Sequence, residues 1–496
     1  MKANPSVWVT GHYIYPDHDE LQLEAQLTGC APKTMEYLES KDKLKKMLKK
    51  NRGITSNKKA ILDCVEFAKY LNKKRLRAIM LNGRVYLYNR KTGIFDKPSR
   101  EFVLKLMKKV LEECEIRVWS TAVESQYYQA FVHEIPFFRG IQPYAGRIVF
   151  QNGTLDVKDM ILARHSYKDY ALSGLPYAYN PDAECPVFLD TLSDIFNHDV
   201  EVIQSFQEMM GYLLYYGNHY PIQKFFIFYG TGSNGKGVLV RVIRNMLGDN
   251  NCSATFLDDL QERFGKQNLY DKYVNISPEH EQKKLFNTAV IKSVTGGDLV
   301  EIEEKYEKAF AMPIYTKFIV CCNQPIKTDD SSRGYFRRLH IFVFPNHYIE
   351  LKACEERVQG VRYMDKQLDI KLEAETQGIC NWALKGLKRL IDNNWEMSPC
   401  KAIDELQEKY YLEANPVENF FECCIRKGDS SCEIKTSALF SCYQQWADRN
   451  DINQGIYNTH KNFRRKAEEC LVKMGRSSNT RRVDGYEYYQ GICINS

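Results

Sequence analysis

The chain lacks any long apolar segment. No window of its 496 residues approaches the roughly 20 consecutive apolar residues that a membrane-spanning helix needs. Met1 to Gly11 also lacks the apolar centre of a secretory signal. These absences argue against an integral membrane protein and against a secreted one. We therefore expect a protein with no membrane partner that works in the cytoplasm.

Cysteine pairs at metal-binding spacing are absent as well. The sequence holds 16 cysteines, but none of them forms a C-x-x-C pair. The neighbours Cys321-Cys322 and Cys423-Cys424 have the wrong spacing for a zinc site or for a disulfide framework. We expect most of the thiols to be reduced and to pack as small apolar side chains.

The sequence also lacks a strong charge of one sign, since its formal net charge is only +6. The basic residues are unevenly placed, because residues 41–59 are rich in lysine and residues 461–482 are also basic. Such runs are usually solvated surfaces, so they permit a polyanionic partner without requiring one. The length suggests about three domains.

A glycine-rich segment is the most informative part of the sequence. It consists of Gly230, Thr231, Gly232, Ser233, Asn234, Gly235, Lys236 and Gly237. It follows the apolar run 225–229 and precedes the helical pattern 238–247, which is the strand, loop and helix context of a P-loop. In such a loop, backbone N–H groups and the helix dipole bind nucleotide phosphates, and Lys236 can reach the terminal ones.

One position of this loop departs from the usual pattern. The Ser or Thr whose hydroxyl helps to hold Mg²⁺ is replaced by Gly237. Magnesium would then depend on water, phosphate oxygens and a carboxylate supplied from elsewhere. The alternative is a glycine-rich turn that binds nothing, but the flanking strand and helix disfavour it. We therefore expect ATP and Mg²⁺ as cofactors.

Polar side chains follow two of the strands predicted downstream. Glu279 and Glu281 come after the strand predicted over 273–276, and Asn323 follows the one over 318–322. ATP hydrolysis needs a carboxylate for water or metal and a polar residue that senses the γ-phosphate. We assign Glu279 to water and metal, Glu281 to the metal in reserve, and Asn323 to the sensor. The plainer alternative is exposed acids and a turn residue.

Two further groups are cationic. Lys305 and Tyr306 lie in a hairpin predicted over 301–310, where a lysine beside an aromatic ring suits a nucleic-acid backbone. Arg337 and Arg338 precede a predicted strand, and one of them could serve as an arginine finger for a neighbouring subunit. A finger implies a closed ring with head-to-tail contacts. Ordinary surface residues are the alternative for both groups.

Alternating strands and helices from Phe225 to Pro345 predict an α/β fold with a mostly parallel sheet. Upstream, Asn82-Gly83 and Asn152-Gly153 each favour a two-residue hairpin turn. Helical periodicity covers 190–216 and 368–393. The predicted divisions are a basic arm over 1–58, an α+β domain over 59–186, a helical collar over 187–224, an ATPase core over 225–345, a helical linker over 346–400 and a winged-helix-like DNA-binding domain over 401–496.

The order of the motifs resembles that of superfamily III helicases, which have an AAA+ P-loop core. The motifs are Gly-Thr-Gly-Ser-Asn-Gly-Lys-Gly, Asn-Ile-Ser-Pro-Glu, Thr-Gly-Gly-Asp, Cys-Asn-Gln-Pro and Phe-Arg-Arg-Leu. More narrowly, they are similar to the helicase part of phage and plasmid primase-helicases related to the poxvirus enzyme. The likeness covers Lys59 to the end of the chain. Pro278 departs from the family, which has a second acidic residue there.

The resemblance implies a homo-oligomeric ring, commonly a hexamer, that hydrolyses ATP and moves from 3′ to 5′ along single-stranded or forked DNA. It also implies a role for each matching residue. These roles are phosphate binding for Lys236, water orientation for Glu279, sensing for Asn323, DNA tracking for Lys305 and the finger for Arg337 or Arg338.

We therefore predict a replicative DNA helicase of a phage, plasmid or other mobile element. We expect no primase domain in the chain, so a separate primase or other replication proteins are candidate partners. A non-motor, ATP-dependent DNA-binding initiator or regulatory ring is the alternative that Gly237 and Pro278 leave open. A small-molecule P-loop kinase is a third class. In the basic tail, Arg464, Arg465 and Arg481 are the expected DNA contacts.

Overall fold

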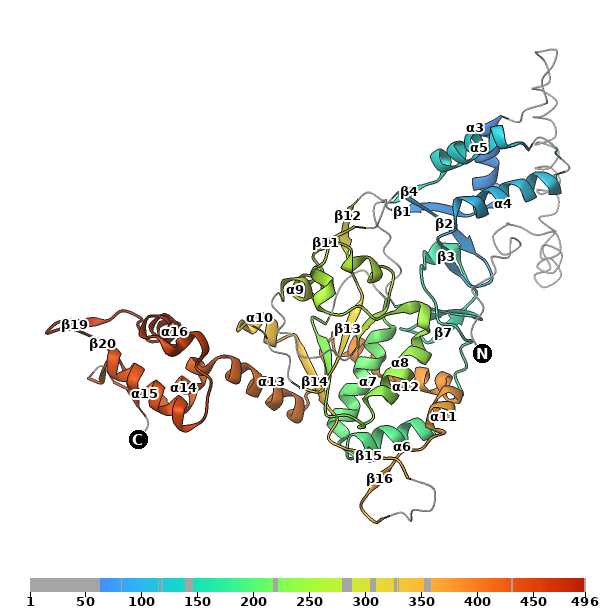
Figure 1. The fold of residues 1–496 in the computed structure, drawn as a ribbon. Helices are drawn as coiled ribbons and strands as arrows, with labels where there is room; N and C mark the ends of the chain where they lie inside the picture. Colours follow the sequence, from blue (N-terminus) through green and yellow to red (C-terminus); the bar gives the residue numbers. More distant parts are fainter. Residues whose placement is uncertain are drawn as a thin grey trace.

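The computed structural model describes most of the chain beyond residue 62. The described residues are 63–81, 83–114, 116, 119–138, 146–216, 222–278, 288–303, 309–324, 328, 330–351, 358–429 and 431–494. They form an N-terminal lobe, a central body and a C-terminal lobe (Figure 1). The predicted basic arm lies outside these residues. No helix within them is long and apolar enough to cross a membrane.

A five-stranded parallel sheet forms the centre of the molecule. In spatial order, its strands are β14 (Leu339–Val343), β8 (Phe225–Tyr229), β13 (Lys317–Cys322), β10 (Val274–Ser277) and β9 (Cys252–Ser253). Four of these strands, including one predicted over 339–344, were predicted to within one residue at each end. The predicted α/β class with a mostly parallel sheet is therefore confirmed. The first four residues of β8 are buried, as is typical of a parallel strand covered on both faces.

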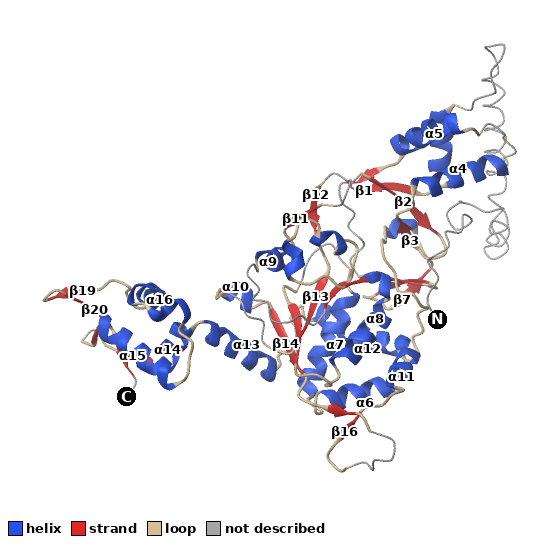
Figure 2. Ribbon diagram, viewed as in Figure 1, coloured by secondary structure: helices blue, strands red, loops and turns tan. Residues whose placement is uncertain are grey.

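Helices α7 (Val200–Leu214) and α12 (Thr376–Asp392) pack tightly against each other in the central body (Figure 2). A Cβ atom on Gly211 would lie 2.3 Å from the backbone nitrogen of Leu387, and one on Gly386 would lie 2.2 Å from the carbonyl oxygen of Gln207. Only glycine allows two helix backbones to approach so closely. The helix that precedes the sheet is thereby joined to a helix that follows it.

Shorter elements surround the sheet. They are α6 (Pro186–Ile195), α8 (Lys236–Leu247), α9 (Ala289–Gly296), β11 (Leu299–Ile302), β12 (Phe310–Pro313), α10 (Arg333–Phe336), β15 (Tyr348–Ile349), β16 (Arg362–Tyr363), α11 (Leu368–Ala374), α13 (Lys401–Ala414) and the 3-10 turns η4 (Asp249–Asn251), η5 (Asp258–Gln261) and η6 (Gly265–Asn268). Strands β11 and β12 pair antiparallel, which confirms the predicted hairpin.

Two stretches that we predicted as continuous helices are each divided. The stretch 190–216 forms α6 and α7, because Asn197 and His198 take positive φ angles of 52° and 60° between them. The stretch 368–393 forms α11 and α12.

The N-terminal lobe has a helical core of its own. Its elements are α3 (Cys64–Tyr70), a π-helical turn η2 (Leu71–Arg75), β1 (Ala78–Leu81), β2 (Arg84–Asn89), β3 (Ile94–Asp96), α4 (Arg100–Glu113), α5 (Thr121–Glu134) and β4 (Phe137–Phe138). Its sheet has the order β3-β2-β1-β4. Leu81 lies opposite Arg84 and Gly83 has a φ of 79°, as the predicted two-residue hairpin requires.

A second small sheet joins this lobe to the central body. It contains β5 (Arg147–Phe150), β6 (Gly153–Asp156) and β7 (Ile161–Ala163), and the 3-10 turn η3 (Tyr167–Asp169) follows. Phe150 lies opposite Gly153, so the turn residues are Gln151 and Asn152, and the predicted Asn152-Gly153 turn is wrong by one residue. A Cβ atom on Gly153 would lie 2.4 Å from the carbonyl oxygen of Ala163, which explains a glycine inside the strand.

The apolar cores of the structure do not follow the domain boundaries that we predicted from the sequence. Ile148 and Leu155 belong to the same apolar core as the parallel sheet, so the division predicted at residue 186 falls inside one core. Ile403 and Tyr411 of α13 also belong to that core, whereas the core of the C-terminal lobe begins at Val417. Helix α13 therefore bridges the central body and the C-terminal lobe.

The C-terminal lobe encloses a small aromatic core. Its elements are α14 (Pro416–Cys424), β17 (Ile425–Lys427), β18 (Glu433–Lys435), α15 (Thr436–Arg449), the 3-10 turn η7 (Gly455–Asn458), α16 (His460–Lys473), β19 (Arg481–Val483), β20 (Tyr486–Gln490) and β21 (Ile492–Ile494). The rings of Tyr443 and Phe463 stack with their centres 4.8 Å apart. Strands β18, β20 and β19 form an antiparallel sheet.

We predict that Gly211→Ala lowers the free energy of unfolding by about 1–3 kcal/mol, because the added methyl group overlaps the α12 backbone. Denaturant unfolding of the purified variant measures this loss. Gly334→Ala is the matched control, since its Cβ atom would meet only side-chain atoms at 3.7 and 3.8 Å. Equal free energies of unfolding for the two variants would show that the close approach of α7 and α12 does not contribute to stability.

Candidate nucleotide-binding site

The glycine-rich loop connects the end of β8 to the start of α8. Gly235 caps the helix with φ 94° and ψ −8°, and a Cβ atom there would lie 2.8 Å from the Cδ1 atom of Ile195. The loop is held from outside, because Tyr348 donates its backbone N–H to the Ser233 carbonyl over 2.7 Å. Contacts with Ile195 of α6 and with Tyr348, which follows β14, therefore fix the shape of the loop.

Lys236 is the first residue of α8 and is only 4% exposed. Its Nζ atom donates to the side-chain oxygen of Asn323 over 2.7 Å and to the carbonyl oxygen of Thr231 over 3.4 Å. It also donates to the carbonyl oxygen of Gly230. Two residues that we singled out from the sequence, 87 positions apart, are therefore in direct contact.

The order of the strands brings these two residues together. Strand β13 lies directly beside β8, with Cys322 opposite Tyr229, so Asn323 emerges next to the glycine-rich loop. The backbone N–H of Gly230 donates to the Cys322 carbonyl over 3.2 Å. Because the carboxyl ends of parallel strands share one edge of a sheet, this edge collects the groups that follow each strand.

Strand β10 ends at the same edge, with Ser277 opposite Val320 of β13. The predicted acids Glu279 and Glu281 follow this strand but lie outside the described residues. Within the described ranges, no three His, Cys, Asp or Glu side chains lie close enough together to hold a metal ion. Lys305 and Tyr306, between β11 and β12, also lie outside the described residues.

A cavity of about 980 Å³ opens beside the loop. Besides loop residues, its walls include Asp190, Asp194, Arg241, Tyr348, Tyr363 and Leu368. The Asp194 carboxylate accepts from the Tyr348 hydroxyl over 2.5 Å and from Arg362 Nε over 3.0 Å. This size and mixture of rings and polar groups are typical of a small-molecule site. The sequence did not reveal the cavity, because its walls come from separate segments that share no motif.

The two arginines lie at the opposite edge of the sheet. The carbonyl of Arg338 accepts from the backbone N–H of Phe225 over 2.8 Å, and Phe225 is the first residue of β8. The Arg338 side chain is buried, and it donates to the Thr295 hydroxyl over 3.0 Å and to the Gly334 carbonyl. Burial and the neighbouring Arg337 lower the pKa of Arg338.

Arg337 differs from its neighbour, because it is exposed. It donates to the side-chain oxygen of Gln223 over 2.9 Å, in a contact that faces solvent. The structure therefore separates the two predicted finger candidates into one that holds the fold together and one that is accessible.

The three predicted DNA contacts of the tail also differ. Arg464 forms ion pairs with Glu468 over 2.8 Å and with Glu487, and Arg481 pairs with Glu433 over 2.9 Å. Arg465 on α16 is exposed and forms no ion pair among the described residues.

Two family models match parts of the chain. One, described as D5 N terminal like, matches residues 122–197, which run from α5 to just beyond α6. The other, described as a family of unknown function (DUF5906), matches residues 228–338. The DUF5906 match begins near the end of β8 and ends at Arg338, so it contains the glycine-rich loop, Asn323 and both arginines.

A protein of Acanthamoeba polyphaga mimivirus with the name "Putative helicase" is 22% identical over 252 residues. The alignment covers 46% of this chain and 25% of that protein, so the chain spans about a quarter of the relative's length. An apo structure of the NrS-1 C-terminal region matches with a TM-score of 0.51 and 12% identity, over 88% of this chain and 100% of that one. The match shows a shared fold.

We predict that Arg338→Ala destabilises the protein by about 2 kcal/mol, because it removes a buried side chain together with its hydrogen bonds to the Thr295 hydroxyl and the Gly334 carbonyl. Arg337→Ala, with an exposed side chain, should change stability by less than about 0.5 kcal/mol. Thermal unfolding of both variants tests the contrast. A larger loss for Arg337→Ala would contradict the assignment of the buried role to Arg338.

Proposed function

We propose that this chain is an ATP-dependent DNA helicase that works as a ring in the replication of a virus, phage or other mobile element. The contact between Lys236 and Asn323 beside the glycine-rich loop carries the proposal. It joins the lysine that we propose binds phosphate to the amide that we propose senses the γ-phosphate. The similarity to the mimivirus protein named "Putative helicase" and to the D5 N-terminal model supports the proposal.

ATP is the proposed substrate of the loop. The backbone N–H groups and the start of α8 would bind the phosphates, and Lys236 would exchange its carbonyl partners for phosphate oxygens. The cavity beside the loop would take the base and ribose. Mg²⁺ would be held by Glu279 or Glu281 with phosphate and water, since Gly237 offers no side chain. Glu279 would also orient the attacking water.

Arg337 is the proposed arginine finger. The arginines and the glycine-rich loop lie at opposite ends of β8, and five strand residues span roughly 16 Å. An arginine at one edge therefore serves a phosphate at the other edge more readily in a neighbouring subunit than in its own. Its exposure suits this role, whereas the side chain of Arg338 is used inside the chain. This arrangement favours the AAA+ type ring of superfamily III, commonly a hexamer.

DNA is the proposed partner of the ring. The β11–β12 hairpin, which would carry Lys305 and Tyr306, is suited to track one strand through the ring with 3′ to 5′ polarity. The C-terminal lobe, with three helices and an antiparallel sheet, is our candidate for the winged-helix domain. Within it, the exposed Arg465 is the best placed of the three arginines to reach a phosphate. A separate primase would supply primers.

A non-motor initiator or regulatory ring is the second candidate. Gly237 favours it, because the loop lacks the hydroxyl that usually helps to hold magnesium for rapid turnover. Such a ring would bind ATP and DNA tightly but would show ATP turnover that DNA does not stimulate.

The central test is strand displacement on a forked DNA with ATP and Mg²⁺. We expect unwinding by the wild type and a loss of more than about 100-fold for Lys236→Ala, because the phosphate contact is removed. Lys385→Ala, which removes an exposed lysine of α12, should retain activity. Unwinding that survives Lys236→Ala would refute the ATP-driven mechanism, and DNA binding without unwinding by the wild type would favour the initiator.

We further predict that Arg465→Glu weakens DNA binding and lowers the slope of log affinity against log salt by about 1, because one phosphate contact is lost. Fluorescence anisotropy at several salt concentrations measures the slope. Arg481→Glu should have a smaller effect, since that side chain is already paired with Glu433. An unchanged slope for Arg465→Glu would mean that α16 is only a solvated surface.

A further inference from the structure

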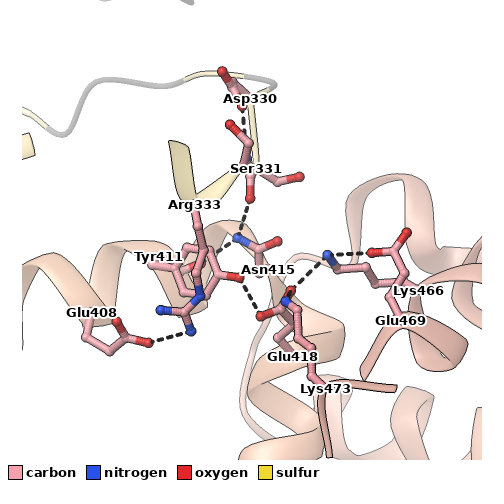
Figure 3. A network of polar contacts seen from close by, with 11 residues as sticks. Asp330, Ser331, Arg333, Glu408, Tyr411, Asn415, Glu418, Lys466, Glu469 and Lys473 are labelled. Atoms are coloured by element: carbon pink, nitrogen blue, oxygen red, sulfur yellow. Dashed lines mark hydrogen bonds and ion pairs between the residues drawn. The ribbon is translucent and has the colours of Figure 1, made fainter. Parts of the chain in front are cut away.

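A network of polar contacts runs from the arginine-bearing segment to the C-terminal lobe (Figure 3). It starts at Asp330, Ser331 and Arg333, just before Arg337, and continues through α13. It ends on α14 and α16 in the C-terminal lobe. The reaction proposed above uses none of these contacts, so their purpose needs an explanation.

Glu418 of α14 is the anchor of the network. It is only 5% exposed, and its Oε1 atom accepts from Lys466 Nζ over 2.8 Å and from Lys473 Nζ over 2.7 Å. Its Oε2 atom accepts from the Tyr411 hydroxyl. Burial opposes ionisation, but these hydrogen bonds outweigh it and lower the pKa of Glu418 to about 2. A buried carboxylate is thus fixed as an anion between two helices of the lobe and α13.

Tyr411 connects this anchor to α10. While its hydroxyl donates to Glu418, its ring lies 4.3 Å from the guanidinium carbon of Arg333 and 5.5 Å from the ring centre of Phe336, edge to face. Arg333 is also paired with Glu408 of α13 over 3.5 Å. Arg333 and Phe336 are the first and last residues of α10. One phenol therefore contacts both ends of the short helix that precedes Arg337.

The backbone of the same segment has a second attachment. Asn415, which is fully buried, donates its side-chain N–H groups to the carbonyls of Ser331 over 3.1 Å and Tyr411 over 2.9 Å. On the other side, Asp330 accepts from Lys292 of α9 over 2.7 Å. The segment is thus held between the central body and the start of the C-terminal lobe.

Arg337 follows α10 directly, so the position of α10 determines the position of the Arg337 backbone. A four-residue helix cannot fix itself, because its few hydrogen bonds do not offset the cost of nucleation. A catalytic side chain is less effective when its neighbours do not hold it in the position that the reaction needs. The contacts of Tyr411 provide this support from α13, and Glu418 links Tyr411 to the C-terminal lobe.

We propose that Tyr411 and Glu418 are positioning residues that hold Arg337 in its catalytic geometry, so that the C-terminal lobe controls ATP hydrolysis at the neighbouring subunit. This inference rests on the proposed function. Helix α16, which supplies Lys466 and Lys473 to Glu418, also carries Arg465. DNA bound to that helix would therefore act on the same network.

The test is the steady-state kinetics of ATP hydrolysis by the full chain. Tyr411→Phe keeps the ring on Arg333 and Phe336 but removes the hydrogen bond to Glu418. We expect kcat to fall about tenfold with the KM for ATP unchanged, because the loop and the cavity do not touch Tyr411. Tyr443→Phe is the matched control, since it removes a buried hydroxyl of the C-terminal lobe that has no hydrogen-bond partner among the described atoms.

Lys473→Gln provides a second variant, whose side chain is 52% exposed. The fold should be retained, because Lys466 still pairs with the Glu418 carboxylate. Like Tyr411→Phe, Lys473→Gln should lower kcat, here by about threefold. The melting temperature should not change. Because Arg337 acts on a neighbour, adding Lys236→Ala subunits with intact Tyr411 should raise the turnover of Tyr411→Phe protein. This rescue separates a positioning role from a general structural one.

Wild-type kcat in both Tyr411→Phe and Lys473→Gln would overturn the inference. An equal loss in Tyr443→Phe, or the absence of rescue by Lys236→Ala subunits, would overturn it as well. In each of these cases the wild type still hydrolyses ATP, so the proposed function stands. If the wild type hydrolyses no ATP, the proposed function fails, and the inference falls with it.

Discussion

The placement of β13 directly beside β8 is the constraint on which the rest of the molecule depends. It brings the Lys236 amine within 2.7 Å of the Asn323 amide, although the glycine-rich loop and Asn323 belong to distant segments. The arginines precede β14, whose first residue lies opposite the first residue of β8, so they are placed at the other edge. One sheet thus separates the proposed phosphate-binding groups from the proposed finger, and the proposed ring would bring the two together.

Three charged side chains that are buried in the described part of the chain each contact polar or aromatic partners. Lys236 donates to carbonyls and an amide, and Glu418 accepts from two lysines and a phenol. Lys317, at the start of β13, donates to the Tyr215 carbonyl among three tyrosine rings, and burial lowers its pKa to about 7. Removing the last partner of such a group costs more than the pair contributes, because a buried charge is then left without compensation. These contacts therefore fix geometry more than they add stability.

Sequence patterns predicted the parts of the fold that depend on local order. The apolar run of β8 and the glycines of the loop identify a strand, a turn and a helix, because burial on both faces and backbone freedom leave a clear pattern. The pairing of Lys236 with Asn323 could be anticipated once both were placed after parallel strands. The roles of Arg337 and Arg338 could not be told apart, because their difference comes from burial against Thr295, which is distant in sequence.

Other features had no local pattern to reveal them. The turn before Gly153 is shifted because a neighbouring strand, and not the turn itself, requires the glycine. The helices over 190–216 separate where Asn197 and His198 take left-handed conformations. The walls of the cavity and the network around Glu418 each combine residues from segments far apart in the chain. Such features arise from tertiary packing, which periodicity and motif spacing do not encode.

The glycine contacts of α7 and α12 have a practical consequence for dissecting the protein. Since the helix before the sheet is locked to a helix after it, a truncation made at the outer strands would expose the backbones that now touch at Gly211 and Gly386. The smallest fragment that keeps the apolar core around the parallel sheet whole extends from Arg147, where β5 begins, to Ala414, where α13 ends. Domain swaps between related proteins should therefore exchange this whole unit.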